Sequence, residues 1–279
     1  MDKLGLIAGG GTLPVEIAQH CERSGRPLFV IRLKGFADAG MAAYAGAEVG
    51  LAELGKCLKA LKRAGCRSVC LAGNVARPDF ASLVPDLKGL ALLPRAIAAA
   101  RNGDDALLRL LVGEFEKAGF QVEGAHQVME DLSLPAGVLG RRTPSEDELA
   151  DARRALQVAR AVGELDVGQA AVVAQGLVLA VEAQEGTDAM LARVAELPTH
   201  LRGRPGAGVG VLAKAPKPIQ ETRVDLPTIG LATVQGVARA GLAGIVGEAG
   251  RLLILDREAT IALADELGVF IAGVGPEGP

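Results

Sequence analysis

The sequence predicts two α/β domains, and three observations predict them. In the first half, apolar runs of about five residues alternate with longer segments of helical periodicity, which is typical of a parallel sheet with right-handed crossovers. Residues 132–147 then interrupt this alternation with prolines, glycines and clustered charge. Beyond them, two apolar runs are separated only by Gln175-Gly176, which predicts an antiparallel hairpin and therefore a mixed sheet.

The first predicted domain covers residues 1–133 and is a Rossmann-like domain with a parallel sheet. The helix predicted over residues 51–64 places Leu54, Leu58 and Leu61 on one face, with basic residues mostly opposite. The expected strands are residues 4–8, 28–33, 68–72 and 120–126. The expected helices are residues 13–24 and 51–64, and residues 83–118 are expected to be mostly helical.

The second predicted domain covers residues 134–279 and consists of a linker and a C-terminal α/β catalytic domain with a mixed sheet. Ser145 and Glu148 form a capping box, so a helix is expected from there to about Val162. The expected strands are residues 170–174, 177–181, 208–213, 222–226, 244–247, 252–255 and 269–272. Further helices are expected from about residue 188 and over residues 229–240 and 257–267.

Composition disfavours several classes of protein. The net charge is −3 and aromatic residues make up only 3% of the 279 residues, which argues against nucleic-acid binding. The four cysteines form no CxxC pair and the histidines are far apart, so we expect reduced thiols and no zinc site. A strand pattern starts almost at once and no apolar segment reaches about 20 residues, so we expect a cytoplasmic protein without signal peptide or membrane span.

The stretch GLIAGGGTLP, residues 5–14, only partly fits a dinucleotide-binding loop. Gly9 and Gly11 match the G-x-G-x-x-G fingerprint, but Pro14 occupies the third glycine position. Arg32 and Lys34 follow the second predicted strand, where the fingerprint has an acidic residue. Backbone N–H groups at the start of a helix still favour an anion, so we predict that Gly10, Gly11 and Thr12 contact a phosphate. A tight turn without a ligand is the alternative.

Three other polar clusters lie at predicted strand or helix ends, where open α/β sheets bind ligands. Asn74 and Arg77 follow the strand at residues 68–72 and could hold a ribose, base or phosphate, or form a turn with an exposed arginine. Asp104 and Asp105 precede a helix, as capping residues do, but carboxylates are also ligands of Mg²⁺.

The third cluster runs from Lys214 to Thr228. If residues 222–226 are a strand, Glu221, Arg223 and Asp225 share one face of it. A solvated face is the alternative, but charges of both signs in one segment are what a metal–phosphate site requires. Thr187 and Asp188, at the start of a predicted helix, form a smaller companion cluster. With no histidine cluster, the expected metal is Mg²⁺ or Mn²⁺ bound by oxygen ligands.

Five of these segments together resemble the LpxI-type UDP-2,3-diacylglucosamine pyrophosphatases of bacterial lipid A synthesis. They occur in order along nearly the whole chain as IAGGGTLP, AGNVARPD, NGDDALL, AQEGTDAML and KAPKPIQETRVDLPTIG. The resemblance implies a hydrolase that converts UDP-2,3-diacylglucosamine to UMP and 2,3-diacylglucosamine 1-phosphate (lipid X). It also implies a divalent metal, lipid binding and a cytoplasmic enzyme in peripheral contact with the inner membrane. The aspartate treated as catalytic in that family falls on Asp225.

From the polar clusters and this resemblance together we predict a set of site residues, of which Asp225 is the one that the resemblance itself supplies. The predicted metal ligands are Asp225, Asp188 and Asp104, and Lys214 and Arg223 are expected to stabilise charge on the phosphate oxygens as catalytic residues with Asp225. The predicted substrate-binding residues are Gly10, Gly11, Thr12, Asn74, Arg77, Thr187 and Thr228.

The acyl chains need an apolar site. Leu87, Leu90, Leu93 and Ile97 recur at helical spacing and could form an acyl groove or simply the core-facing side of a helix. The alternatives to hydrolysis are another nucleotide-sugar enzyme, such as a dehydrogenase or transferase, and a non-catalytic nucleotide- or lipid-binding module. A homodimer is left open.

Overall fold

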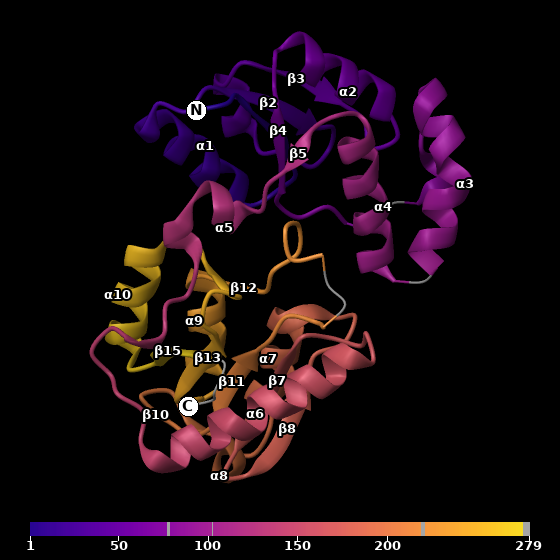
Figure 1. The fold of residues 1–279 in the computed structure, drawn as a ribbon. Coiled ribbons are helices and arrows are strands. Elements are labelled where there is room, and N and C mark those ends of the chain that lie inside the picture. The colour runs from indigo at the N-terminus through magenta and orange to yellow at the C-terminus, as the bar shows by residue number, and fades with distance from the viewer. Residues whose placement is uncertain (77–78, 102, 219–220, 276–279) are drawn as a thin grey trace. The chain divides into compact units, whose positions relative to one another are not determined.

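The computed structural model describes residues 1–76, 79–101, 103–218 and 221–275 (Figure 1). The chain folds as two compact units. Unit 1 contains Met1–Glu130 together with the three residues Arg223–Asp225, and unit 2 contains Asp131–Thr222 and the chain from Leu226 onward. A short segment from late in the sequence therefore packs as part of the N-terminal unit.

The sheet of unit 1 is parallel throughout. Its order is β3-β2-β1-β4-β5, and each neighbouring pair is parallel. The strands are β1 (Leu4–Ala8), β2 (Leu28–Leu33), β3 (Gly46–Val49), β4 (Ser68–Ala72) and β5 (Gln121–Val122). The predicted Rossmann-like sheet is confirmed, and the strand order reverses between β1 and β4, which makes this pair the switch point of the sheet.

Helices connect the strands of unit 1. They are α1 (Thr12–Ser24), α2 (Leu54–Arg63), α3 (Leu87–Arg101), α4 (Asp104–Lys117) and α5 (Ala125–Val128), with short 3-10 turns η1 (Ala39–Ala43) and η2 (Phe80–Ser82). The apolar face predicted for α2 is confirmed, because Leu54, Leu58 and Leu61 are buried in the main core of the unit. Pairs of α2, α3 and α4 pack side by side in chain order.

Two expectations for unit 1 were incomplete. Strand β3 was missed, because Gly46–Val49 is short and half polar and so lacks a clear strand signal. The strand expected over residues 120–126 is limited to Gln121–Val122, because helix α5 begins at Ala125 and its Gln127 side chain accepts a hydrogen bond from the Gly124 N–H.

The main sheet of unit 2 is mixed, as predicted. Its order is β6-β15-β13-β11-β7-β8; β11, β13 and β15 are parallel, and β6, β7 and β8 run antiparallel to their neighbours. The strands are β6 (Gly137–Leu139), β7 (Ala170–Ala174), β8 (Leu177–Val181), β11 (Val211–Lys214), β13 (Gly244–Glu248) and β15 (Phe270–Val274). The hairpin between β7 and β8 is confirmed, with φ of 52° at Gln175 and 76° at Gly176.

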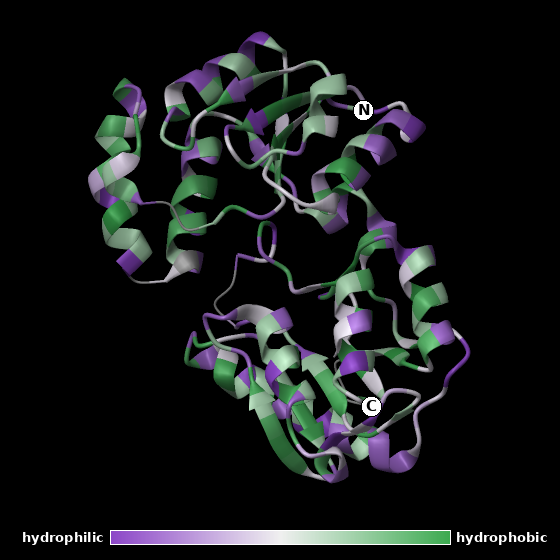
Figure 2. Ribbon diagram, turned by 180° about the vertical axis from the view of Figure 1, so that it is seen from behind, coloured by the Kyte–Doolittle hydropathy of each residue, from purple (hydrophilic) through white to green (hydrophobic). Residues whose placement is uncertain are grey.

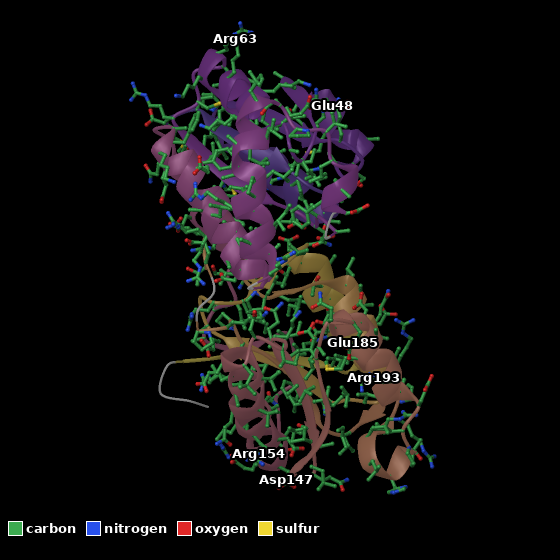
Figure 3. The ribbon with its side chains drawn as sticks, turned by 90° about the vertical axis from the view of Figure 1, so that its right-hand side faces the viewer. Glu48, Arg63, Asp147, Arg154, Glu185 and Arg193 are labelled. Carbon is green, nitrogen blue, oxygen red and sulfur yellow. The ribbon has the colours of Figure 1, made fainter. Side chains whose placement is uncertain are left out.

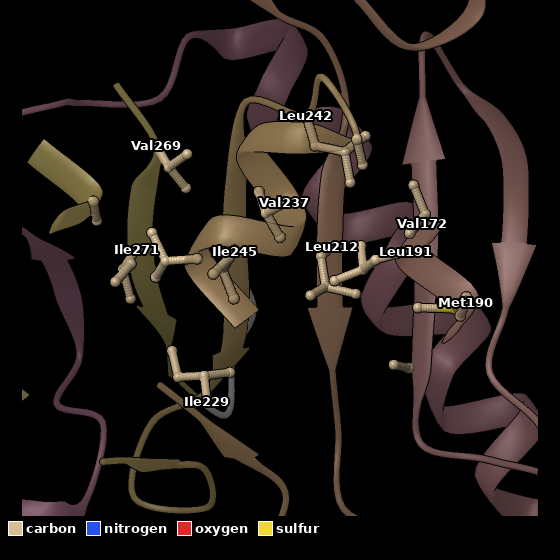
Figure 4. Packing of buried hydrophobic residues seen from close by; sticks show 14 of the residues in the cluster. Val172, Met190, Leu191, Leu212, Ile229, Val237, Leu242, Ile245, Val269 and Ile271 are labelled. Carbon is tan, nitrogen blue, oxygen red and sulfur yellow. The ribbon is translucent and has the colours of Figure 1, made fainter. Parts of the chain in front are cut away.

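Helices cover both faces of this sheet. One face packs on α6 (Glu146–Glu164) through Ala152, Ala155, Leu156 and Ala159. The other face, shown in Figure 4, packs on α7 (Gly186–Ala195), α9 (Leu231–Arg239) and α10 (Arg257–Leu267). The capping box is present, since the Ser145 Oγ accepts from the Glu148 N–H and the Glu148 carboxylate accepts from the Ser145 N–H.

The smaller elements of unit 2 lie around this three-layer core. They are η3 (Glu130–Leu132), which starts at the unit boundary, α8 (Thr199–Arg202), and the two-stranded pairs β9 (Gly203–Arg204) with β10 (Ala207–Gly208) and β12 (Thr228–Ile229) with β14 (Leu253–Ile254).

Two predicted segments differ from the structure in ways that bear on the site. Within the predicted linker, Gly137–Leu139 pair with β15 as an edge strand. The strand expected over residues 222–226 is wrong: Thr222–Val224 form a turn, and Val224 packs against the core of unit 1. A period-two pattern of only five residues cannot distinguish a strand from a loop that buries one side chain.

No helix in the described part of the chain is both long and apolar enough to cross a membrane.

Candidate functional site

The glycine loop after β1 is bonded to the loop after β4. The Gly9 N–H donates to Ala72 O (2.8 Å), the Gly10 N–H donates to Asn74 O (2.9 Å), and the Asn74 N–H donates to Gly10 O (2.8 Å). The two loops are therefore bonded to each other at the switch point of the sheet. The Gly9 and Gly10 amides donate to these internal hydrogen bonds, so they do not donate to a ligand.

Close approach explains why glycines occupy this loop. A Cβ at Gly9 would lie 2.8 Å from Asn74 O, and one at Gly10 would lie 2.9 Å from Phe36 O. Opposite them, a Cβ at Gly73 would lie 2.7 Å from the Pro14 ring. Pro14 therefore fits where the dinucleotide fingerprint has its third glycine, because the facing residue Gly73 has no side chain.

The start of α1 still presents backbone donors to an anion. Gly11 has a φ of 88°, and with Thr12 it lies exposed at the helix N-terminus, where the first amides of a helix have no intrahelical acceptor. By contrast, the Arg32 guanidinium at the end of β2 donates to Met41 O and Tyr44 O, so it holds η1 in place. The loop can thus bind one anionic group through Gly11 and Thr12, while Gly10 sets its shape.

A cavity of about 440 Å³ lies in unit 1 at the carboxyl ends of the strands. Ile7, Leu33, Val49 and Leu71 of β1 to β4 form its floor, and side chains of α2, α3 and α4 complete its lining. Ligand cavities are typically of roughly this size, about 300–1,000 Å³. The charged or amide side chains that line it are Glu53, Asn74 and Asp225, and the rest of the lining is mostly apolar.

The segment Arg223–Asp225 reaches this cavity by packing on unit 1. Arg223 forms an ion pair with Glu116 of α4 (2.7 Å), and Val224 packs against the core. The backbone passes so close to Gly124 that a Cβ there would lie 3.1 Å from the Arg223 Cα. These contacts place Asp225 in the cavity lining, together with Gly73 and Asn74.

Glu53 is a cavity residue that the sequence analysis missed. Its carboxylate accepts from the Gly50 N–H (2.6 Å) and from the Lys56 ammonium (3.3 Å), so it closes the loop between β3 and α2. The Gly50 hydrogen bond lowers the pKa of this carboxyl from its ordinary value and keeps it ionised. Recognising β3 would have placed Glu53 at a strand end, where it becomes a candidate.

His126 lies beside the Arg223–Asp225 segment and was also missed. Its ring is within contact of the position that a Cβ on Gly124 would take, next to the Arg223 backbone. Nδ1 is buried without a hydrogen-bond partner in the described part of the chain, and burial lowers the pKa of the imidazole. His126 is therefore neutral near pH 7.

In unit 2, three predicted site residues come together. Lys214 is buried at the end of β11, and its Nζ donates to Thr187 Oγ1 (2.9 Å) and to Thr228 O (3.1 Å). Thr187 Oγ1 in turn donates to Oε1 of the buried Glu182 (2.7 Å), which the sequence analysis had not singled out. Lys214, Thr187 and Glu182 thus form a continuous chain of hydrogen bonds, in which the two charged residues are buried and Thr187 is partly buried.

The remaining predicted residues are not brought into either group. Asp188 is exposed in the first turn of α7. Asp105 pairs with Arg109 one turn along α4 and does not cap the helix, whose N-cap is Gly103. The side chain of Asp104 lies outside the described part of the structure, as does Arg77. Among the described residues, no group of three or more His, Cys, Asp or Glu side chains could hold a metal by itself.

The fold and the site define a class. This is an α/β protein whose Rossmann-like unit has a mostly apolar cavity at the switch point of its sheet, with Asn74 and Asp225 in the cavity lining. Comparison with known families then identifies it further. The LpxI N-terminal domain matches residues 3–132, and the LpxI C-terminal domain matches residues 135–272.

The chain belongs to the LpxI family, which confirms the resemblance inferred from its motifs. It is 64% identical over 277 residues to a protein of Caulobacter vibrioides named UDP-2,3-diacylglucosamine pyrophosphatase LpxI. The alignment covers 99% of each chain.

Proposed function

We propose that this chain is a UDP-2,3-diacylglucosamine pyrophosphatase of lipid A biosynthesis. It hydrolyses the diphosphate of its substrate to UMP and 2,3-diacylglucosamine 1-phosphate (lipid X). The observation that carries the proposal is identity of 64% along 99% of a relative with that name. The cavity supports it independently, because Asn74 and Asp225 line a mostly apolar space at the switch point of the sheet, and the exposed start of α1 at the same switch point offers backbone amides to a phosphate.

In this proposal, the apolar part of the cavity takes acyl chain. Each methylene removed from water contributes about 0.8 kcal/mol, so ten methylenes contribute roughly 8 kcal/mol. Of the residues predicted for an acyl groove on α3, Leu93 lines the cavity, together with Leu92 and Ala96, whereas Leu87 and Leu90 are exposed. A strongly held product leaves slowly, and we expect lipid X to remain bound during purification.

Asp225 orients and deprotonates the attacking water. The water oxygen bonds to one phosphorus, the bridging P–O bond breaks, and the bridging oxygen leaves with the other phosphate. The Gly11 and Thr12 amides bind phosphate oxygens, and Asn74 positions the nucleotide or a phosphate. Arg223 contributes positive charge from the same segment as Asp225, held in place by Glu116.

We also propose a divalent cation, Mg²⁺ or Mn²⁺. The donors present fit an ion that is completed by substrate, because Mg²⁺ usually binds one or two carboxylates and takes its other oxygens from phosphates and water. Asp225 would supply a carboxylate, and Asp188 and Asp104 remain the other predicted ligands. When bound, the ion neutralises diphosphate charge and lowers the pKa of water.

Turnover of the substrate in ¹⁸O-labelled water tests the reaction. We expect UMP and lipid X as products, with the label in one of them, and loss of activity in EDTA that Mg²⁺ or Mn²⁺ restores. The position of the label identifies the phosphorus that is attacked. If the chain binds UDP-2,3-diacylglucosamine but releases no UMP with any divalent metal, the proposal of an enzyme is rejected in favour of a non-catalytic binding module.

The variant Asp225→Asn tests the catalytic residue. We expect kcat to fall by about 10²–10⁴-fold, the usual contribution of a general base, with substrate binding and melting temperature preserved. Asp131→Asn is a control for an aspartate that does not line the cavity and should retain wild-type turnover. Near-normal kcat in Asp225→Asn would reject the assignment.

A further inference from the structure

Three large apolar side chains near the start of α3 are exposed. Val84, Leu87 and Leu90 are 82%, 89% and 57% accessible, and their spacing of three residues places Leu87 and Leu90 on one side of the helix. Val84 lies three residues before the helix begins. Single exposed apolar residues are common, but several close together in the chain are typical of an interaction surface.

The opposite side of α3 is fixed against unit 1. A Cβ at Gly89 would overlap Ala52 O, and the Gly89 N–H donates to the Asp86 carboxylate (2.8 Å). Leu92 is buried in the core, and Leu92, Leu93 and Ala96 line the cavity. Rotation of α3 to bury Leu87 and Leu90 would therefore break the close packing of Gly89 on Ala52 and remove Leu92 from the core.

Basic residues outnumber acidic ones around these side chains, although Asp86 directly precedes Leu87 and accepts hydrogen bonds from the Lys56 and Gly89 N–H groups. Helices α2 and α3 pack on each other, and every charged residue in them is basic: Lys56, Lys59, Lys62, Arg63, Lys88, Arg95 and Arg101. Arg95 pairs with Glu114 and Lys56 pairs with Glu53, whereas Lys59 and Lys88 are exposed, and Figure 3 shows Arg63 projecting outward from α2. Hydrophobic and hydrophilic positions both occur along α3 in Figure 2. The chain as a whole has a net charge of −3, so this basic region is local.

We infer that the exposed side of α3, flanked by the basic residues of α2, docks on an anionic lipid surface. A helix with exposed apolar side chains and basic flanks binds at the lipid interface, where the apolar groups enter the headgroup region and the basic groups attract anionic lipids. A second copy of the chain is a poorer partner for this surface, because a symmetric dimer would bring its like charges together. The same helix thus has one side on the lipid surface and the other on the cavity.

Vesicle cosedimentation tests the docking surface without any assay of activity. We expect the wild type to bind phosphatidylglycerol-containing vesicles and to bind phosphatidylcholine vesicles weakly, with salt releasing it. Leu87→Ser/Leu90→Ser should weaken binding about tenfold, because two apolar side chains no longer enter the interface. The matched control is Leu165→Ser/Leu177→Ser, which alters two exposed leucines of unit 2 and should bind as the wild type does.

A charge variant provides the second arm. Lys59→Glu/Lys88→Glu should weaken binding to anionic vesicles by at least about fivefold per residue and should leave weak binding to phosphatidylcholine unchanged. The surface assignment is overturned if the wild type binds no vesicles, or if the control weakens binding as much as the α3 variant does. A change in oligomeric state with unchanged vesicle binding would make a second copy the partner instead.

An activity measurement adds a readout that rests on the proposed function. With substrate embedded in anionic vesicles, turnover by Leu87→Ser/Leu90→Ser should fall in parallel with binding, and with substrate dispersed in detergent it should equal that of the wild type. Vesicle binding without UMP release in the wild type would reject the proposed function and leave the docking surface standing. Equal losses in vesicles and detergent would reject the docking role in substrate uptake.

Discussion

Units 1 and 2 use polar residues at their strand ends in different ways. In unit 1, Asn74 and Asp225 border an open cavity, and the exposed start of α1 lies at the same switch point of the sheet. In unit 2, Lys214 at the end of β11 is buried and bonded through Thr187 to Glu182. The same sequence signal, a charged or amide residue at the end of an apolar strand, therefore occurs both beside an open cavity and in an internal network.

The difference has a topological cause. In unit 1 the strand order reverses between β1 and β4, so the loops that follow them leave in opposite directions and a crevice forms. In unit 2, Lys214 lies on an interior strand whose neighbours are β7 and β13, and α7 supplies Thr187 to meet it. A polar group in such a place must be bonded within the protein, because an unpaired buried charge is costly. Three measurements test this difference between the two units.

The largest expected effect comes from the Lys214 network. Lys214→Met should lower the free energy of unfolding of unit 2 by about 3 kcal/mol, because it leaves buried Glu182 and Thr187 without their cationic partner. Denaturant unfolding with hydrogen exchange would locate the loss. Lys217→Met, which breaks a more exposed pair with Asp166, is the control and should cost less. Equal losses in the free energy of unfolding for the two variants would contradict the role of the buried network. Loss of turnover in a folded Lys214→Met variant would support the catalytic role predicted for Lys214.

A medium effect is expected from enlarging one leucine in each unit. Leu212→Phe in the fully buried core of unit 2 should cost about 1–3 kcal/mol, because the added atoms have no free volume. Leu111→Phe, at the cavity of unit 1, should cost clearly less, because the ring enters existing space. Thermal unfolding of both variants tests this, and a larger cost at Leu111 would contradict it. If acyl chain occupies the cavity, Leu111→Phe should also raise KM for the long-chain substrate.

The smallest effect concerns acid stability. Burial raises the pKa of the Glu123 carboxyl, but hydrogen bonds from Arg26 (2.8 and 2.9 Å) and Ser68 outweigh it, so the pKa is below its ordinary value of 4.5. A lowered carboxyl pKa stabilises the fold above about pH 4.5, and this contribution is lost as pH falls through the folded-state value. Glu123→Gln should therefore lower stability by about 1–2 kcal/mol at pH 7, with the difference from wild type shrinking towards pH 3.

Melting curves between pH 7 and pH 3 measure this difference. Glu185→Gln is a control in unit 2, because Glu185 is an exposed carboxylate paired with Arg193, and its effect should be small at every pH. A difference in melting temperature between Glu123→Gln and the wild type that stays constant from pH 7 to pH 3 would show that ionisation of Glu123 does not contribute to the pH dependence of stability.

Much of the fold was predictable because its signals are local. The buried runs of β1, β4 and β7, the apolar face of α2, the capping box at Ser145 and the Gln175-Gly176 turn each depend on residues close in sequence. Segments with weak local signals were not predictable. Gly46–Val49 becomes a strand only because β2 lies beside it, and Gly137–Leu139 only because β15 offers an edge.

For the candidate site, the types of residue were easier to predict from the sequence than their arrangement in space. Asn74 and Asp225 were both predicted, and both line the cavity, but the strand expected to present Asp225 is a turn. Leu87 and Leu90 were expected to face inward, because their spacing marks a helical stripe without showing which stripe is buried. Gly89 decides that question, since its missing side chain lets α3 approach Ala52 closely.

The sequence alone was enough to predict the alternation of strands and helices, the division into two α/β units, and the residue types of the candidate site, namely an amide-bearing turn, a carboxylate and apolar side chains. Only the tertiary structure decided that Arg223–Asp225 packs with the N-terminal unit, that Lys214 is enclosed in a buried network and that a cavity opens at the switch point. The physical reason is that periodicity and capping act over a few residues, whereas burial depends on which distant surfaces meet.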